Sequence, residues 1–184
     1  MKVLYTGGAG KYATEIQKLT STLEFFFPNR QECNLLNKHS MQNYARKHKY
    51  FDIVVTGANQ FPGRLEDLNF NSFEIPVNHL CLIEMLQKKP KYFIHLTTGM
   101  SDYDEHFLYR AQKTFAENLF TRYFYFERNL ETRFINFHPH HVDDQEIRKK
   151  SALVFLKLLE NIENYQKLEY SVDIPNLKPV NYKF

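Results

Sequence analysis

The segment Lys2–Ala13, with the sequence KVLYTGGAGKYA, places a short apolar run directly before a glycine-rich turn. The run KVLY at 2–5 is typical of a buried parallel strand. Beyond the turn, apolar residues recur at helical spacing over 14–23, which predicts a helix. A strand joined to a helix by a tight glycine turn predicts the first unit of a parallel α/β sheet.

Strand and helix patterns alternate along the rest of the chain. Apolar, β-branched or aromatic runs predict strands at 23–27, 31–35, 51–57, 92–96, 132–137 and 168–174. Helices are predicted at 40–50, 76–87, 107–126 and 144–164, with Pro76 at the first position of its helix. Residues 61–75 indicate mostly loop, and the tail 176–184 indicates irregular structure. The pattern predicts a parallel α/β sheet with helices on both faces.

Length and composition limit the class of protein. A chain of 184 residues suits a single domain spanning 1–184. The net charge of +3 forms no basic stripe, which argues against nucleic acid as a partner. No apolar run reaches the length of a membrane span, so no membrane contact is expected. The N-terminus starts with a strand pattern instead of a signal peptide, and Cys33 and Cys81 form no C-x-x-C pair, which predicts a cytoplasmic protein with free thiols.

The first turn carries a signal for a dinucleotide. Gly7 and Gly10 lie between the first strand and the first helix, where glycines let the backbone approach a pyrophosphate. Ala13 stands at the third glycine position as the smallest substitute for close packing of helix and strand. A plain tight turn in an unrelated α/β protein has the same string. The position at the first strand–helix junction favours a dinucleotide site.

A second signal lies between the strand at 92–96 and the helix that follows it. Tyr109 and Lys113 are four residues apart, so both project from one face of a helix. A Tyr hydroxyl ordinarily has a pKa of about 10, and a nearby ammonium lowers it, which allows proton exchange with a carbonyl or alcohol. Thr98, at the end of the strand, is a candidate to hold the substrate oxygen. The alternative is an ordinary Tyr–Lys pair on a helix surface.

Taken in order, these strings resemble the short-chain dehydrogenase/reductase family. The ordered set is TGGAGKYA (6–13), VVTGAN (54–59), VN (77–78), LTTG (96–99), Y-x-x-x-K (109–113) and NFHPHHV (136–142). The resemblance runs from Met1 to about Ile174. It implies a Rossmann-type doubly wound parallel β-sheet with helices on both faces. It also implies an NAD(P)-dependent oxidoreductase that passes hydride between nicotinamide and a carbonyl or alcohol.

The resemblance assigns four catalytic positions. Tyr109 matches the acid/base of the family, and Lys113 matches the residue that lowers its pKa and holds the nicotinamide ribose. Thr98 stands where the family usually has Ser, with Thr97 as an alternative. Asn78 matches the helix Asn that supports a water-mediated proton path to Lys.

The resemblance also implies a set of cofactor contacts. Ala58 and Asn59 match a segment along the adenosine ribose, Pro139 and Val142 match a segment against the nicotinamide, and Asn34 falls near the adenine edge. Arg30 follows the second strand, with no acid before Glu32, and Lys11 adds a cation in the turn, which favours NADP over NAD. Solvated surface is the alternative for both cations. The cofactor-binding set is Gly7, Gly10, Lys11, Tyr12, Arg30, Asn34, Ala58, Asn59, Pro139 and Val142.

Several departures from the family pattern keep a second function open. The chain is shorter than typical members, Thr98 replaces Ser, and His140 replaces a glycine. Only a short polar stretch follows Val142, where relatives build a lid that keeps water out. The alternative is therefore a non-catalytic dinucleotide-binding protein with a sensing or scaffold role. A nucleotide-sugar epimerase or dehydratase also fits the turn, but the sugar-binding extension of such enzymes is missing.

Two further features concern metals and partners. The histidines of HPHH (138–141) project in different directions from a strand end, with no spaced Cys or carboxylate, so no metal site is predicted. Family members commonly dimerise or form tetramers through their long helices. The helix predicted at 107–126 is apolar on much of its circumference, which predicts a homodimer or homotetramer through this helix.

Overall fold

The computed structural model describes residues 1–58, 71–97, 107–126, 131–139, 144–165, 169–173 and 176–181. Within them, seven strands form one sheet in the order β2-β1-β3-β4-β5-β6-β7. Six of these strands pair in parallel, and the last pairs antiparallel to its neighbour. Their bounds are β1 Lys2–Tyr5, β2 Glu24–Phe26, β3 Ile53–Thr56, β4 Tyr92–Leu96, β5 Arg133–His138, β6 Glu169–Asp173 and β7 Lys178–Asn181.

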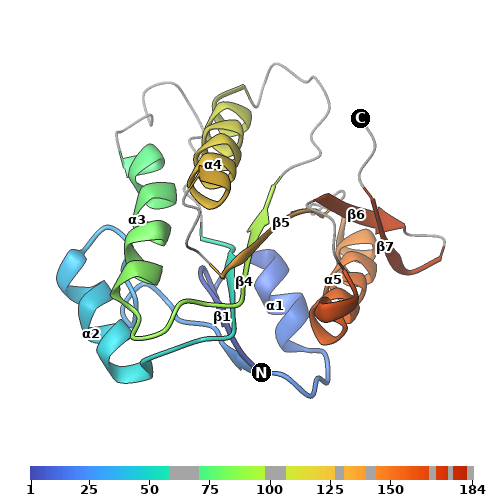
Figure 1. Cartoon of the computed structure of the whole chain (residues 1–184). Coiled ribbons are helices and arrows are strands. Elements are labelled where there is room, and N and C mark those ends of the chain that lie inside the picture. Colours follow the sequence, from blue (N-terminus) through green and yellow to red (C-terminus); the bar gives the residue numbers. More distant parts are fainter. Residues whose placement is uncertain are drawn as a thin grey trace.

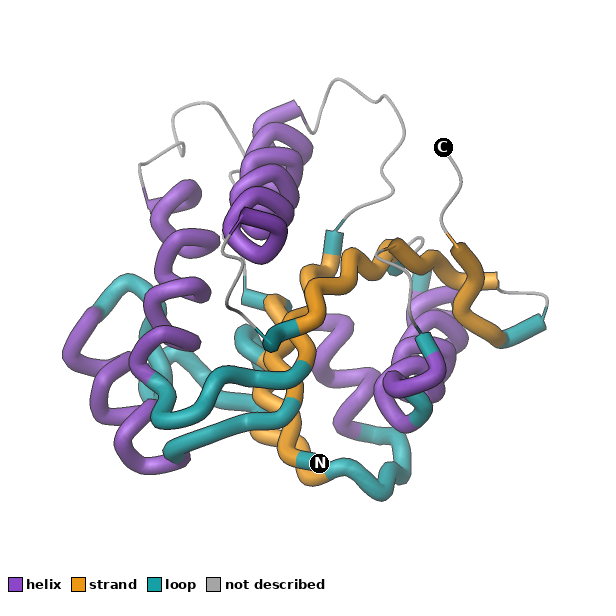
Figure 2. Tube along the Cα trace, in the orientation of Figure 1, coloured by secondary structure: helices purple, strands orange, loops and turns teal. Residues whose placement is uncertain are grey.

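Helices cover both faces of the sheet (Figures 1 and 2). On one face α1 (Lys11–Gln17) packs against α5 (Gln145–Glu160), which a short 3₁₀ helix at Ile162–Asn164 follows. On the other face α3 (Asn71–Met85) lies between α2 (Lys38–His48) and α4 (Phe107–Phe126). The expected doubly wound α/β architecture is therefore confirmed. None of the helices in the described part of the chain is both long and apolar enough to cross a bilayer.

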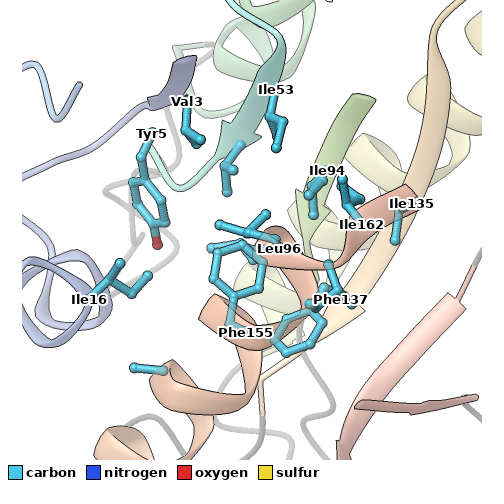
Figure 3. Packing of buried hydrophobic residues seen from close by; sticks show 14 of the residues in the cluster. Val3, Tyr5, Ile16, Ile53, Ile94, Leu96, Ile135, Phe137, Phe155 and Ile162 are labelled. Carbon is cyan, nitrogen blue, oxygen red and sulfur yellow. The ribbon is translucent and has the colours of Figure 1, made fainter. Parts of the chain in front are cut away.

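Alternating side chains on the strands supply two hydrophobic cores. Val3, Ile53, Ile94 and Ile135 face α1 and α5, and Figure 3 shows them beside Phe155 of α5. The opposite set of strand residues, such as Leu4, Val54, Phe93 and Phe134, packs with α2, α3 and α4. Because successive side chains of a strand point to opposite faces, one strand contributes to both cores.

Two predictions at the edges of the sheet were wrong. Residues 31–35 form turns instead of a strand, because the Asn29 side chain accepts hydrogen bonds from the backbone N–H groups of Gln31 and Glu32 and fixes a turn there. The tail predicted to be irregular contains β7, which extends the sheet beyond β6. Its partner, β6, is near in sequence, but residue types alone do not identify β6 as the partner.

The third helix also begins earlier than predicted. It starts at Asn71, so Pro76 lies inside it and not at its first position. A proline in the second turn removes a hydrogen bond to one of the first carbonyls of the helix. The sequence pattern before Pro76 alternates poorly, and the prediction therefore assigned that part to a loop.

The strand order has its topological switch point at β1. After β1 the chain continues to β2 on one side and to β3 on the other. In open α/β sheets, ligands bind outside the carboxyl ends of the strands at such a switch point. The turns that follow β1 and β3 are therefore the expected place for a ligand.

Candidate functional site

The turns after β1 and β3 touch one another at the switch point. Gly7 has φ +75°, and a Cβ added to it would lie 2.7 Å from the Cα of Ala58. A Cβ on Gly57 would lie 2.2 Å from a ring carbon of Tyr5. Both positions require glycine, because the Ala58 backbone fills the side-chain space at Gly7 and the Tyr5 ring fills it at Gly57.

The glycine turn also lies against the end of β2. A Cβ on Gly8 would lie 2.4 Å from the carbonyl oxygen of Phe27, and the Gly8 N–H donates to the oxygen of Pro28 at 3.3 Å. Gly10 is less constrained, because its Cβ would meet only the Gly7 oxygen, at 3.2 Å. Gly8 and Gly57 were missed by the sequence analysis, since no spacing rule marks a glycine whose neighbour is distant in sequence.

The residues assigned to the cofactor divide into exposed and buried groups. Lys11 and Arg30 are exposed at the carboxyl ends of β1 and β2. Tyr12 is buried, and its hydroxyl lies 3.0 Å from the Ser151 hydroxyl on α5. Burial raises the pKa of Tyr12 above its ordinary value, so the phenol stays neutral. The Tyr12 side chain is thus part of the α1/α5 packing, which leaves its backbone as the part near the turn.

Other assigned contacts are placed as follows. Asn34 is half-buried, and its side-chain oxygen accepts the backbone N–H of Leu36 at 3.0 Å. Ala58 donates its backbone N–H to the Thr6 hydroxyl at 3.2 Å. Pro139 is buried directly after β5. Asn59 and Val142 lie outside the described residues.

Lys113 is buried on α4 at the carboxyl ends of the central strands. Its ammonium donates a hydrogen bond of 2.7 Å to the carbonyl oxygen of Leu96, the last residue of β4. Burial lowers the pKa of Lys113 to about 8, because the charged form loses hydration. Tyr109 lies on α4 one turn before Lys113, but its side chain is outside the described part of the structure. The ammonium is therefore held at the carboxyl edge of the sheet, at the end of β4.

Three buried histidines surround this position on the same face of the sheet. His79 of α3 lies 2.8 Å from the Thr6 hydroxyl, and His95 of β4 lies 2.8 Å from the Thr56 hydroxyl. His138 of β5 lies 3.3 Å from the Thr97 hydroxyl. The sequence analysis did not assign His79 or His95 to the site. The available signal was a single polar residue inside an apolar strand, as in the run YFIHL at 92–96.

Burial keeps the imidazoles of His79 and His95 neutral. Desolvation lowers the pKa of His79 to about 3, with a further contribution from Lys113 and an opposing one from the Ile75 backbone. Burial lowers the pKa of His95 as well, with a further contribution from the positive charge of Lys113. A neutral imidazole has one donor and one acceptor nitrogen, so each can link a hydroxyl to a second group. We call this set of residues, Thr6, Thr56, His79, His95, Thr97 and His138, the polar layer.

The structure places the two candidate threonines and Asn78 differently. Thr97 is buried in the polar layer, whereas Thr98 lies outside the described residues. Asn78 lines a groove between α2, α3 and α4, and its neighbour His79 lines the small cavity beside Lys113. Two of the four residues assigned to catalysis, Asn78 and Lys113, have side chains that the structure describes. Asn78 lines the groove and Lys113 lines the small cavity, so the two residues are in different pockets.

Solved structures with the same fold are numerous, although no family model and no curated protein matches the sequence. A protein from Listeria innocua has a TM-score of 0.66 at 19% identity, covering 93% of this chain and 98% of the other. A small-chain dehydrogenase has a TM-score of 0.67 at 15% identity, covering 96% and 98%. A GDP-L-fucose synthetase from Naegleria fowleri, bound to NADP, has a TM-score of 0.53 at 15% identity, covering 75% and 53%. The chain therefore has the Rossmann-type fold found in short-chain dehydrogenases, as its motifs predicted.

Proposed function

We propose that the protein is an NADP-dependent oxidoreductase that passes hydride between nicotinamide and a small carbonyl or alcohol. The observation that carries this proposal is the buried Lys113 ammonium, which lies one helical turn after Tyr109 at the carboxyl edge of the sheet. An ion of this kind costs free energy to bury, which argues for a chemical use. The structural neighbours that are dehydrogenases or reductases support the same class of activity.

The turns at the switch point fit a dinucleotide. Gly7, Gly8 and Gly57 let the ends of β1, β2 and β3 pack closely, and the more open Gly10 leaves space where bound phosphates could approach the backbone of the turn. Lys11 and Arg30 would supply positive charge, and Pro139 would lie near the nicotinamide end. When bound, the cofactor supplies or accepts the hydride.

The residues of this chain would handle the proton. Tyr109 would donate its phenolic proton to the carbonyl oxygen during reduction and take it back during oxidation. Lys113, charged at neutral pH, would favour the phenolate and hold the ribose hydroxyls. A strand-end hydroxyl, Thr98 or Thr97, would orient the substrate oxygen, and Asn78 is kept as a candidate for the proton path.

The preference for NADP rests on the end of β2. Arg30 is exposed there and makes no ion pair among the residues that the structure describes. Glu32, the nearest acid, accepts the Asn29 backbone N–H at 2.9 Å and is engaged in the turn. A 2′-phosphate would gain a charge-assisted hydrogen bond from Arg30. Arg30→Ala should therefore weaken NADP binding about tenfold and leave NAD binding unchanged, with Arg46→Ala on α2 as the control in calorimetry.

The test of catalysis is Tyr109→Phe. This variant should lose NADPH oxidation by about 10²-fold or more with a carbonyl found in a substrate panel, and it should still bind NADPH. Calorimetry with both dinucleotides provides the control. Full turnover in the variant would remove Tyr109 from the mechanism, and failure of both dinucleotides to bind would remove the proposal.

The second candidate is a non-catalytic dinucleotide-binding protein with a sensing or scaffold role. The position of Lys113 favours it, because its ammonium donates to the Leu96 carbonyl and the residue is only 8% exposed. Binding of NADP without turnover over a broad carbonyl panel would select this candidate.

We also propose a homodimer in which α3 and α4 of two copies pack together. A groove of about 620 Å³ runs between α2, α3 and α4, and Val77 and Phe115 beside it are 42% and 37% exposed. Much of the aromatic content of α4 packs internally, as Phe120 and Phe124 do against Phe93. A double variant, Val77→Glu with Phe115→Glu, should shift the mass measured by light scattering from dimer to monomer, and a monomeric parent would contradict the proposal.

A cytoplasmic location is part of the same proposal. Cys33 and Cys81 are both free thiols in the structure. Free thiols persist in a reducing compartment, which supports this placement.

A further inference from the structure

His95 has one nitrogen with a partner and one without. It lies in the middle of β4 and is 3% exposed. Its Nδ1 lies 2.8 Å from the Thr56 hydroxyl. Its Nε2 makes no hydrogen bond of acceptable geometry with the described residues, although the backbone of Lys113 is close enough to raise the pKa of His95. A buried polar nitrogen left without a partner costs about 1–3 kcal/mol, so a missing partner is expected.

A small cavity lies beside His95. Its volume is about 10 Å³, and its walls include the side chains of His95, Lys113, His79 and Gln112. This is close to the minimum space for one water molecule, and the walls are polar enough to bind one. Thr56, Ala58, Pro76, Ala116 and Phe120 close the remaining sides.

We propose that His95 is a positioning residue for Lys113, acting through one water molecule bound between His95 Nε2 and the Lys113 ammonium. The water accepts a hydrogen bond from the ammonium and donates one to Nε2. This requires the tautomer with its proton on Nδ1, donated to the Thr56 hydroxyl. The positive charge of Lys113 favours that tautomer, since it turns the lone pair of the imidazole toward the cation.

The ionisable groups around Lys113 are consistent with this arrangement. They are His79 from α3, His95 from β4, His138 from β5, and Glu117 one turn along α4, whose carboxylate accepts from the Asn136 amide at 3.3 Å. Burial keeps His79 and His95 in the neutral form. They therefore solvate the ammonium as dipoles and add no repulsive charge.

His79 lines the same cavity but has a different role. Its Nδ1 lies 2.9 Å from the Ile75 oxygen and must donate to it, so its Nε2 accepts from the Thr6 hydroxyl at 2.8 Å. Both nitrogens are thus used within the protein. His79 joins α3 to β1, whereas His95 alone of the pair offers an atom to the cavity.

The consequence for the proposed function is control of the charge and position of Lys113. A water held by His95 keeps the ammonium hydrated when the cavity is closed to solvent. The catalytic benefit rests on the proposed oxidoreductase activity, whereas the hydrated contact itself does not.

The test follows the titration of Lys113 by NMR in the full chain with ¹³C-labelled lysine, the signal being assigned with Lys113→Arg. His95→Phe removes Nε2 and its water, and should lower the midpoint by about one pH unit, a tenfold change in the ratio of ammonium to amine. His95→Gln places a polar group at the cavity and should titrate as the parent does. His79→Gln is the matched control and should also leave the midpoint unchanged.

Three results would overturn the proposal. The first is a parental midpoint in His95→Phe. The second is an equal shift in His95→Gln and His95→Phe, which would assign the effect to the Thr56 contact. The third, which does not depend on whether the Phe variant folds, is a high-resolution crystal structure of the parent with no water between His95 and Lys113. None of these measurements needs a substrate, so the loss of the oxidoreductase proposal would leave this one standing.

Discussion

On the α1/α5 face of the sheet, apolar side chains continue to the ends of the strands, whereas hydroxyls and imidazoles replace them on the α3/α4 face. Tyr5, Val55 and Leu96 end their strands on the first face. Thr6, Thr56 and His95 occupy the corresponding places on the second face. Both sets are buried, so exposure does not explain the difference. The contrast supports the proposed function, in which one face supplies stability and the other accepts the cost of buried polar groups to form the site.

The largest effect should come from replacing the charge in the polar face. Lys113→Met should reduce carbonyl-dependent NADPH oxidation by about 10²- to 10⁴-fold, because the phenolate of Tyr109 loses its cation. Thermal unfolding should show equal or higher stability, since an apolar chain replaces a buried charge. A large loss of stability together with retained turnover would contradict the division between the two faces.

Removing a large apolar side chain from the α1/α5 face should have the opposite effect: it should reduce stability and leave turnover unchanged. Phe155 is completely buried and packs on Tyr12 and Phe137. Phe155→Ala should lower the free energy of unfolding by about 3–5 kcal/mol through lost burial and a cavity. Urea denaturation measures this loss, and the fraction that remains folded should turn over at the parental rate.

The polar layer should make the protein sensitive to acid. The pKa of His79 is lowered to about 3 in the folded state from its ordinary value of 6.5. The unfolded chain therefore binds the extra proton between these values, so stability is full above pH 6.5 and falls as the pH decreases. Between pH 7 and pH 5 the free energy of unfolding should fall by about 2 kcal/mol from His79 alone. In urea denaturation His79→Gln should flatten this dependence, whereas replacing the exposed His39 should not.

The smallest effects should separate the two glycines of the first turn. Gly7→Ala places a Cβ 2.7 Å from the Ala58 backbone at a φ of +75°, and it should cost more than about 1 kcal/mol in thermal unfolding. Gly10→Ala meets only the Gly7 oxygen at 3.2 Å and should cost less than about 1 kcal/mol. If a dinucleotide lies on this turn, both variants should bind it more weakly in calorimetry. Unchanged binding by Gly10→Ala would place the cofactor elsewhere.

Sequence predictions were correct where a strong local pattern specifies the structure, and they were wrong where the pattern is ambiguous or pairing with another segment decides the structure. The strand at 92–96 was predicted with the bounds that the structure gives, because four of its five buried residues are apolar or aromatic. The strand predicted at 31–35 failed because a local side-chain turn at Asn29 competes with an ambiguous pattern. Residues 178–181 form a strand because they pair with β6, and their sequence alone does not predict this pairing.

The candidate site shows the same limit. The sequence indicated Lys113 and the glycine turn, because spacing along one helix and position at one junction are local properties. The structural roles of Gly57, His79 and His95 come from contacts with residues 39 to 73 positions away in the sequence. The Thr56–His95 and Thr6–His79 contacts are examples. Residue type and spacing carry no record of such contacts.

Local patterns along the chain specify the alternation of strand and helix, the first glycine turn, and the position of Tyr109 and Lys113 on one helix. The tertiary structure alone decided which glycines are crowded by distant backbone, that Tyr12 faces α5, and that three histidines gather beside a buried ammonium. The physical reason is that periodicity and turn chemistry act between near neighbours, whereas burial and its effect on charge arise only when separate elements pack together.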